Sequence, residues 1–151
     1  FSSATARALA VAEENPDDVV CGFDTVVECE GEVFGKPKDE ADAVRMLRAL
    51  SGREHRVWSG VCIREGEKVL AESECTSVHF RALTDEEIHA YIATGEPLDK
   101  AGAYGIQGPA AVFVKRVEGC YFTIIGMPMH KLYHMLAKVG IYPDWQRAAR
   151  T

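Results

Sequence analysis

Apolar residues recur at helical spacing in four separate parts of the chain, and polar residues that favour helix ends flank them. Asp39 is placed to cap one of these segments, and Thr84 with Glu87 forms a capping box at the start of another. Gly52, Gly95 and Gly140 follow three of them, as expected for helix ends. The predicted helices cover residues 4–14, 40–50, 85–94 and 129–139.

Runs of apolar and β-branched residues between these helices predict strands. Residues 64–67 (Arg-Glu-Gly-Glu) separate two such runs and predict a hairpin turn. The glycine-rich stretch 96–108 is expected to form a long loop, and the polar tail 144–151 is expected to fray. The predicted strands cover residues 19–28, 57–63, 68–80, 110–117 and 121–125.

Helices and strands alternate along the chain, with hairpins among them, which predicts a layered α/β domain with a mixed β-sheet. A length of 151 residues favours a single domain. Forty-seven per cent of the residues are hydrophobic and 26% are charged, a balance that is typical of globular proteins and excludes a disordered or collagen-like chain. No apolar run reaches the ~20 residues of a membrane span, so no membrane partner is expected.

The chain carries 23 acidic and 17 basic residues, and its net charge of −6 argues against nucleic-acid polymers as partners. The net charge does not exclude a small anionic ligand, because a local group of lysines or a bound metal reverses the field locally. The five cysteines form no CxxC pair, which indicates a reducing compartment, and we expect the cytoplasm. The chain begins with Phe1 rather than Met, so we expect that an N-terminal segment is missing.

Three short segments are candidates for chemistry. Asp24 lies inside an apolar strand, where a carboxylate is costly unless it is paired or binds a metal, although it could also end the strand and cap a turn. Lys36 stands between glycine and proline, which excludes a P-loop but allows either a phosphate clamp or a solvated turn. Gln107 lies in the glycine-rich loop, where its amide suits the edge of a nucleobase, unless the loop is only a surface feature.

Taken in order, these segments resemble the Maf family of nucleoside triphosphate pyrophosphatases, and the resemblance spans nearly the whole chain. The strongest match is Asp99–Gly108, DKAGAYGIQG. The other matching segments are Gly22–Val27, Gly35–Pro37, Leu50–Arg53, Ser59–Val61, Phe80–Arg81, Gly95–Pro97 and Gly126–Pro128.

The resemblance implies a three-layered α/β/α fold like that of the inosine triphosphate pyrophosphatases, and hydrolysis of a nucleoside triphosphate to the monophosphate and pyrophosphate. It also implies a divalent metal, Mg²⁺ or Mn²⁺, and a homodimer. The DKAGAYGIQG loop resembles the subfamily that prefers dTTP and UTP.

By position, Asp24 matches the proton acceptor of the family, and it could alternatively hold the metal. Thr25 and Gln107 match positions that set substrate choice, and Lys36 matches a phosphate contact. Arg53 and Lys100 are added as substrate-binding residues on charge and motif position.

The SxSPRR segment of the family and a glutamate downstream of it would lie before residue 1, so we expect residues 1–151 to be a single Maf-like domain that lacks its N-terminal segment. Two alternatives remain at this stage. One is a nucleotide-binding regulator of cell division that does not turn over its ligand. The other is a purine-type, inosine triphosphate pyrophosphatase, which the DKAGAYGIQG loop disfavours.

Overall fold

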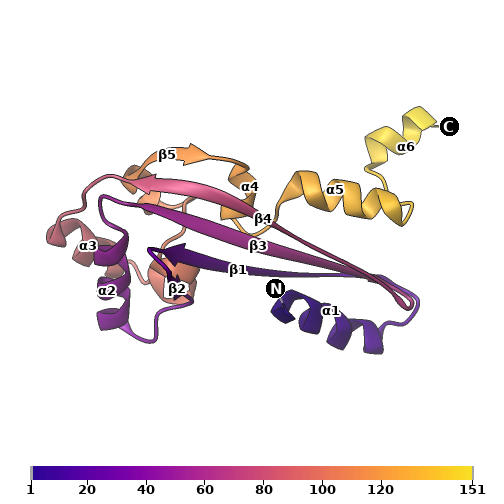
Figure 1. Ribbon diagram of the computed structural model, residues 1–151, viewed down its shortest axis with the longest axis horizontal. Helices are drawn as coiled ribbons and strands as arrows, with labels where there is room; N and C mark the ends of the chain where they lie inside the picture. Colours follow the sequence, from indigo (N-terminus) through magenta and orange to yellow (C-terminus); the bar gives the residue numbers. More distant parts are fainter. Residues whose placement is uncertain (1, 151) are drawn as a thin grey trace.

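A twisted five-stranded sheet supports the rest of the fold, as seen in the computed structural model, which describes residues 2–150 of the chain (Figure 1). The strand order is β2-β1-β3-β4-β5, and each of the four pairings is antiparallel. The predicted α/β class is confirmed, but the expectation of a mixed sheet is wrong, because the strands are joined by hairpins and antiparallel returns. The strands are β1 (Val19–Cys29), β2 (Glu32–Phe34), β3 (Glu54–Glu65), β4 (Lys68–Phe80) and β5 (Val114–Glu118).

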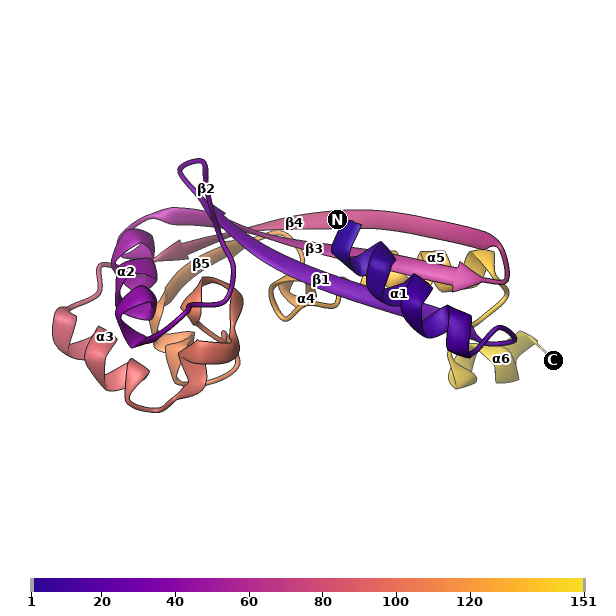
Figure 2. The same ribbon diagram turned by 90° about the horizontal axis from the view of Figure 1, so that it is seen from below.

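Helices lie at both ends of this sheet and on both of its faces (Figure 1, Figure 2). None of the helices in the described part of the chain is long and apolar enough to cross a lipid bilayer. The α-helices are α1 (Ser2–Glu14), α2 (Glu40–Leu50), α3 (Asp85–Ile92), α4 (Tyr121–Ile124), α5 (Met129–Lys138) and α6 (Asp144–Arg150). The 3₁₀ segments are η1 (Glu96–Asp99), η2 (Ala101–Ala103) and η3 (Pro109–Phe113).

The predicted helix caps form as the sequence indicates. The Asp39 carboxylate accepts a 2.8 Å hydrogen bond from the backbone N–H of Asp42 at the start of α2. The side chains of Thr84 and Glu87 form a complete capping box at the start of α3. Arg81 pairs with Glu87 at 2.6 Å, and its hydrogen bonds lower the pKa of the Glu87 carboxyl to about 2. The start of α3 is therefore fixed both locally and to the end of β4.

Two helices cover opposite faces of the long strands, which confirms the layered arrangement (Figure 1). Neighbouring residues of a strand point to opposite faces of a sheet. On β3, Cys62 packs against α1, whereas Val61 and Ile63 pack against Met135 of α5. Helix α1 contacts the sheet through three small residues, Ala4, Ala8 and Ala12.

The largest core lies at the other end of the sheet, where α2, α3 and the 3₁₀ segments pack on β1, β3 and β4. This core fixes the segments that follow α3 against the sheet, and it buries aromatic and aliphatic side chains from all of these elements. Its largest fully buried members include Phe34, Leu47, Leu50, Val57, Val78, Phe80 and Ile88. The segment 96–108 is therefore no free surface loop but contains two 3₁₀ turns, η1 and η2.

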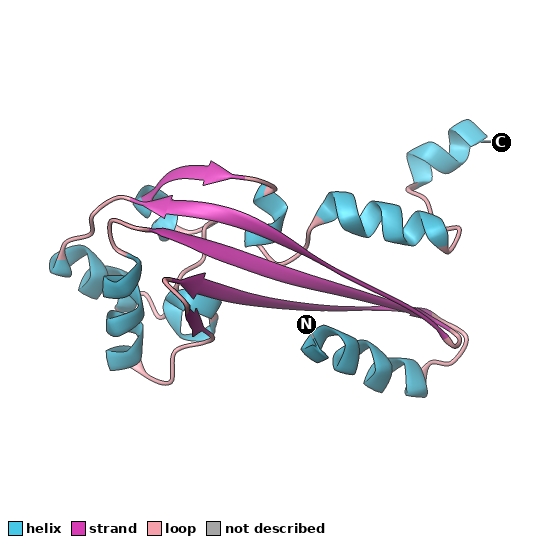
Figure 3. Cartoon of the chain, viewed as in Figure 1, coloured by secondary structure: helices cyan, strands magenta, loops and turns pink. Residues whose placement is uncertain are grey.

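The predicted strand 121–125 is instead the short helix α4 (Figure 3). Polar tertiary contacts explain the difference. The Ser59 hydroxyl donates a 2.7 Å hydrogen bond to the carbonyl of Thr123, and the Thr76 hydroxyl donates one of the same length to the carbonyl of Cys120. These two bonds from the sheet hold the segment as a turn, although its residues favour a strand.

Two further predictions need correction. Residues 110–117 were expected to be one strand, but the first part of this range belongs to η3 and only the part from Val114 belongs to β5. Pro109 explains the difference, because proline favours the first position of a helical turn and cannot donate to a sheet. The tail, which was expected to fray, contains helix α6 up to Arg150. The short strand β2 was not foreseen.

Helix α1 packs closely on the sheet at Gly22. A Cβ atom at this position would overlap the carbonyl oxygen of Ala4 and lie 3.0 Å from the backbone nitrogen of Ala8. We therefore expect Gly22→Ala to lower the free energy of unfolding by about 1–3 kcal/mol, the usual cost of overpacking. Gly35→Ala is the matched control, because a Cβ atom there meets nothing within 4 Å. Urea unfolding measures both variants, and an equal loss in the two would contradict the packing argument.

Candidate active site

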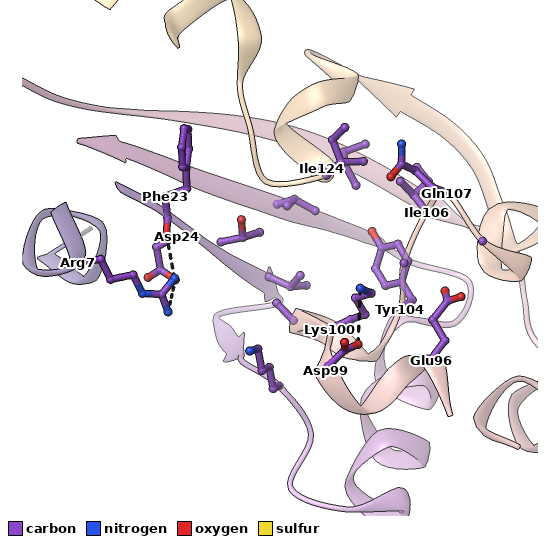
Figure 4. Close-up of a pocket in the computed structure, with 18 residues that line it drawn as sticks. Arg7, Phe23, Asp24, Glu96, Asp99, Lys100, Tyr104, Ile106, Gln107 and Ile124 are labelled. Carbon is purple, nitrogen blue, oxygen red and sulfur yellow. Dashed lines mark hydrogen bonds and ion pairs between the residues drawn. The ribbon is translucent and has the colours of Figure 1, made fainter. Parts of the chain in front are cut away.

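A pocket of about 570 Å³ lies between the middle of β1 and the 3₁₀ segments η1 and η2 (Figure 4). Side chains reach it from β1, from the helix α1, from the segment after β2, from residues 96–108 and from the end of α4. Five of the six residues predicted from the sequence line this pocket. They are Asp24, Thr25, Lys36, Lys100 and Gln107.

Asp24 lies at one end of the pocket, and 18% of its side chain is exposed. It lies on the part of β1 that extends beyond β2, because β2 pairs only with residues 27–29. Its partner is Arg7 of α1, whose Nη2 is 3.8 Å from Asp24 Oδ1 and whose Nη1 donates a 2.9 Å hydrogen bond to the carbonyl of Phe23. The carboxylate therefore faces a cation and the open pocket together.

Arg7 also lines the pocket, although no pattern in the sequence indicated it. Arg7 belongs to no motif, and only the packing of α1 on β1 brings it beside Asp24. A helical wheel would have shown that Arg7 adjoins the alanine face of α1. That signal alone could not have indicated which strand residue it contacts.

Thr25 is held by a chain of hydroxyl contacts. Its Oγ1 is 3.0 Å from Ser59 Oγ, and Ser59 donates its proton to the carbonyl of Thr123. Because Ser59 has one proton to give, Thr25 is the donor in the bond between the two hydroxyls. The lone pairs of the Thr25 oxygen consequently remain available as acceptors at the pocket wall.

Lys36 and Lys100 lie on segments that a backbone hydrogen bond joins. The N–H of Gly102 donates a 3.1 Å bond to the carbonyl of Gly35. Lys100 Nζ is 3.6 Å from Asp99 Oδ1, and both lysines are exposed at the pocket. The glycine at 102 is required by its positive φ of 72° and by the side chain of Val27, which a Cβ atom would approach to 2.9 Å.

The charges in the pocket balance, but they are not evenly distributed. Among the described residues that line it, three are basic (Arg7, Lys36, Lys100) and three are acidic (Asp24, Glu96, Asp99). Figure 4 shows Arg7 and Asp24 at one end, Lys100 with Asp99 between, and Gln107 with Glu96 at the other end. An elongated ligand with an anionic end and a neutral polar end matches this arrangement.

The segment that carries Gln107 is anchored by a buried pair of aromatic side chains. Tyr104 Oη and His55 Nε2 are joined by a 2.6 Å hydrogen bond, and both rings pack edge-on against Phe80. Burial, together with the nearby His79, lowers the pKa of His55 to about 4. His55 had no ligand-like spacing in the sequence, and its contribution emerges only from the packing of β3 against residues 101–108.

Arg53 is not brought to this pocket. Its Nε lies 3.6 Å from Glu30 Oε1, and its Nη1 donates a 3.0 Å hydrogen bond to the carbonyl of Ala49. The side chain is exposed at the end of α2, where the chain turns into β3. Charge and motif position suggested Arg53, but neither determines on which side of a turn a side chain projects.

The donor set of the pocket is compatible with a metal that arrives with phosphates. Within the described part of the chain there is no cluster of three or more His, Cys, Asp or Glu residues that could hold a metal ion. Mg²⁺ commonly binds through one or two carboxylates together with substrate phosphates and water. Asp24 is the carboxylate at the Arg7 end of the pocket, so the residues present fit such a shared site rather than a metal cage made by the protein alone.

Comparison with known proteins identifies the family of the chain. Residues 2–139 match the family model described as Maf-like protein. The chain belongs to the Maf-like protein family. The resemblance seen in the sequence motifs is thereby confirmed.

Several curated relatives of this Maf-like chain carry the name dTTP/UTP pyrophosphatase. The protein of Syntrophomonas wolfei is 48% identical over 136 residues, which cover 89% of this chain and 72% of the relative. That of Chromobacterium violaceum is 50% identical over 125 residues, covering 83% and 63%. That of Bacillus cereus strain ZK is 47% identical over 141 residues, covering 93% and 74%. These matched regions span about two thirds to three quarters of the relatives' lengths.

The depressed pKa of His55 makes stability depend on pH. Because the unfolded chain binds a proton near the ordinary pKa of 6.5 and the folded chain near 4, the unfolded state gains protons first as the pH falls. The contribution of His55 is therefore complete above about pH 6.5 and is lost as the pH falls toward 4. We expect the loss of this contribution to lower the free energy of unfolding by about 2 kcal/mol between pH 7.5 and pH 5.

Urea unfolding of the Maf-like protein and of His55→Gln at these two pH values measures this effect. The glutamine variant should be less stable at pH 7.5, because its amide replaces the ring that packs on Phe80. It should also lose less stability than the wild type when the pH falls. Identical losses in the two proteins would show that His55 does not cause the pH dependence.

Proposed function

We propose that this Maf-like protein hydrolyses dTTP and UTP to the nucleoside monophosphate and pyrophosphate. The observation that carries the proposal is the convergence of Asp24, Lys36, Lys100 and Gln107 on one pocket, in a chain 46–50% identical to relatives named dTTP/UTP pyrophosphatase. The pocket volume of about 570 Å³ is within the usual range for small-ligand sites.

The basic side chains support binding of the triphosphate. Arg7, Lys36 and Lys100 reach the pocket from three different segments, so they can contact separate phosphate groups. Positive groups held in place lower the barrier most where negative charge grows in the transition state. The growing charge here lies on the bridging oxygen that leaves with the pyrophosphate. Arg53, which does not line the pocket, has no part in this proposal.

Asp24 is the proposed catalytic residue. A water oxygen attacks the α-phosphorus, the bond from that phosphorus to the bridging oxygen breaks, and pyrophosphate leaves. The Asp24 carboxylate either takes the proton of the attacking water or would hold a divalent metal that acidifies this water. A divalent ion, Mg²⁺ or Mn²⁺, would supply charge neutralisation and an acidified water when it is bound. Arg7, 3.8 Å away, keeps the carboxylate oriented.

Gln107 and Thr25 are the proposed substrate-selecting residues. The exposed amide of Gln107 lies at the end of the pocket away from Asp24, where a base would lie when the phosphates contact the basic residues (Figure 4). An amide offers both a donor and an acceptor, which match the N3 and O4 edge of uracil or thymine. The free lone pairs of Thr25 add a hydrogen-bond acceptor on the β1 side of the pocket.

Other features follow from the same proposal. Nucleoside triphosphates and divalent metal are the expected small-molecule partners, and their abundance in the cytoplasm supports that location. A homodimer and the exclusion of nucleic-acid polymers stay predictions. The net charge of −6 supports the latter, because duplex binding relies on an excess of basic residues.

The first test is pyrophosphate release from dTTP, UTP, CTP, ATP, GTP and ITP with Mg²⁺ or Mn²⁺. We expect release mainly from dTTP and UTP. Asp24→Asn should lower kcat by at least about 10²-fold, the usual scale for a general base, while the side-chain volume and the neighbouring Arg7 are retained. Glu86→Ala, an exposed change on α3, is the control.

The outcomes separate the alternatives. Binding of nucleotide without any release would overturn the enzyme proposal and favour a regulator. Release mainly from ITP would overturn the pyrimidine preference. An unchanged kcat in Asp24→Asn would overturn the assigned role of Asp24 but not the activity itself.

The assignment of Gln107 is tested by its alanine variant. Gln107→Ala should lower kcat/KM for UTP by about tenfold, the value of one lost hydrogen bond, and should affect CTP much less. The ratio of kcat/KM values for UTP and CTP is the measurement. An equal fall on every nucleotide would show that Gln107 supports turnover in general rather than reading the base.

A further inference from the structure

The carboxylate of Glu96 lies directly beneath the segment that carries Gln107. Its Oε1 accepts a 2.7 Å hydrogen bond from the hydroxyl of Tyr91. The same hydroxyl accepts a 2.9 Å hydrogen bond from the backbone N–H of Gly105. Glu96 is thus linked through Tyr91 to the backbone two residues before Gln107.

Two glycines bring the backbone into contact with this carboxylate. A Cβ atom at Gly105 would lie 2.9 Å from Glu96 Oε1. One at Gly108 would lie 2.7 Å from Oε1 and would overlap Oε2. The absence of a side chain at the glycines on both sides of Gln107 therefore lets the backbone approach the end of the Glu96 side chain closely. This contact explains two of the three regularly spaced glycines of the loop, and Val27 explains the third.

Tyr91 is itself a rigid support. It is buried on α3, its ring packs edge-on against Phe113 with 5.4 Å between the ring centroids, and α3 begins at the capping box of Thr84. Burial and the bond to Glu96 raise the pKa of the Tyr91 hydroxyl, so it stays a proton donor throughout the neutral range.

The negative charge of Glu96 is unfavourable for binding a triphosphate, so its place in the pocket needs a physical reason. A carboxylate that lines a pocket for a triphosphate repels the substrate and weakens binding through space. Figure 4 shows Glu96 at the Gln107 end, away from Arg7 and Asp24. A contribution to the geometry of the base-binding end accounts for a negative group at this place, since the repulsion is smallest there.

We propose that Glu96 is a positioning residue that, together with Tyr91, fixes the segment Gly105–Gly108 and so sets where Gln107 presents its amide to the base. The inference rests on the proposed function and deepens it. Glu96 acts on base selection through Gln107, and it does not act on the phosphates.

A double-mutant cycle tests this route, because residues that act through one another are not additive. Glu96→Ala should lower the preference for UTP over CTP by about tenfold, through a higher KM for UTP with little change in kcat. In a Gln107→Ala background the same change should have almost no further effect on the preference. Glu96→Gln keeps an acceptor for Tyr91 and should retain most of the preference. Tyr91→Phe should lower the preference for UTP over CTP several-fold.

The glycine contact gives a second, independent test. Gly108→Ala should lower the UTP preference, because its methyl group and the Glu96 carboxylate cannot both keep their positions and the contact of Glu96 with the segment is disturbed. Adding Glu96→Ala removes the obstructing carboxylate, so the double variant should be no worse than Glu96→Ala alone. Glu86→Ala again serves as the control for loss of an exposed carboxylate.

Binding measurements separate this proposal from the proposed function. Calorimetry with UMP and CMP reports the base preference whether or not the protein turns over triphosphates. If Glu96→Ala only lowers the melting temperature, or if its effect adds in full to that of Gln107→Ala, the positioning role is wrong and the pyrophosphatase proposal stands. If the wild type binds uridine nucleotides with a preference that depends on Glu96 but releases no pyrophosphate, the positioning role stands and the pyrophosphatase proposal is wrong. A wild type that neither binds nor cleaves them overturns both.

Discussion

The antiparallel pairing of β1 with β3 is the constraint on which the site depends. The register places Asp24 opposite Gly60 and Thr25 opposite Ser59. Because neighbouring residues of a strand point to opposite faces, this register directs Asp24 toward α1 and Thr25 toward the Ser59 hydroxyl. A slip by one residue would exchange the two faces and separate the carboxylate from Arg7. The alanine contact of α1 and the core around Met135, one on each face, both oppose such a slip.

Local patterns predicted most of the secondary structure, because caps and hairpins depend on residues close in sequence. The box of Thr84 and Glu87 and the hairpin turn at 64–67 are examples. Segments decided by distant partners could not be predicted in this way. Helix α4 is held by bonds from Ser59 and Thr76, more than forty residues away in each case. Its strand-like composition was therefore misleading.

The same distinction applies to the candidate site. Short motifs indicated Asp24, Lys36 and Gln107, and the fold brings these residues to one pocket. Arg7 belongs to no motif, and its contact with Asp24 arises from the packing of α1 on a face of the sheet. Arg53 shows the opposite case, because this basic residue in a matching segment pairs with Glu30 and does not line the pocket. Motifs indicate candidate residues, whereas the direction of each side chain depends on the backbone around it.

The hydrogen bond between Gly102 and Gly35 has a consequence for how the chain can vary in length. It joins the segment that carries Lys36 to the segment that carries Lys100, so the spacing of the two ammonium groups depends on the backbone as well as on side-chain rotamers. Insertions near residue 35 or residue 102 would change that spacing. The turn at Glu30 and Gly31, which is exposed, lies outside this link. Length variation is therefore compatible with the site at the tip of the β1–β2 hairpin but not at its base.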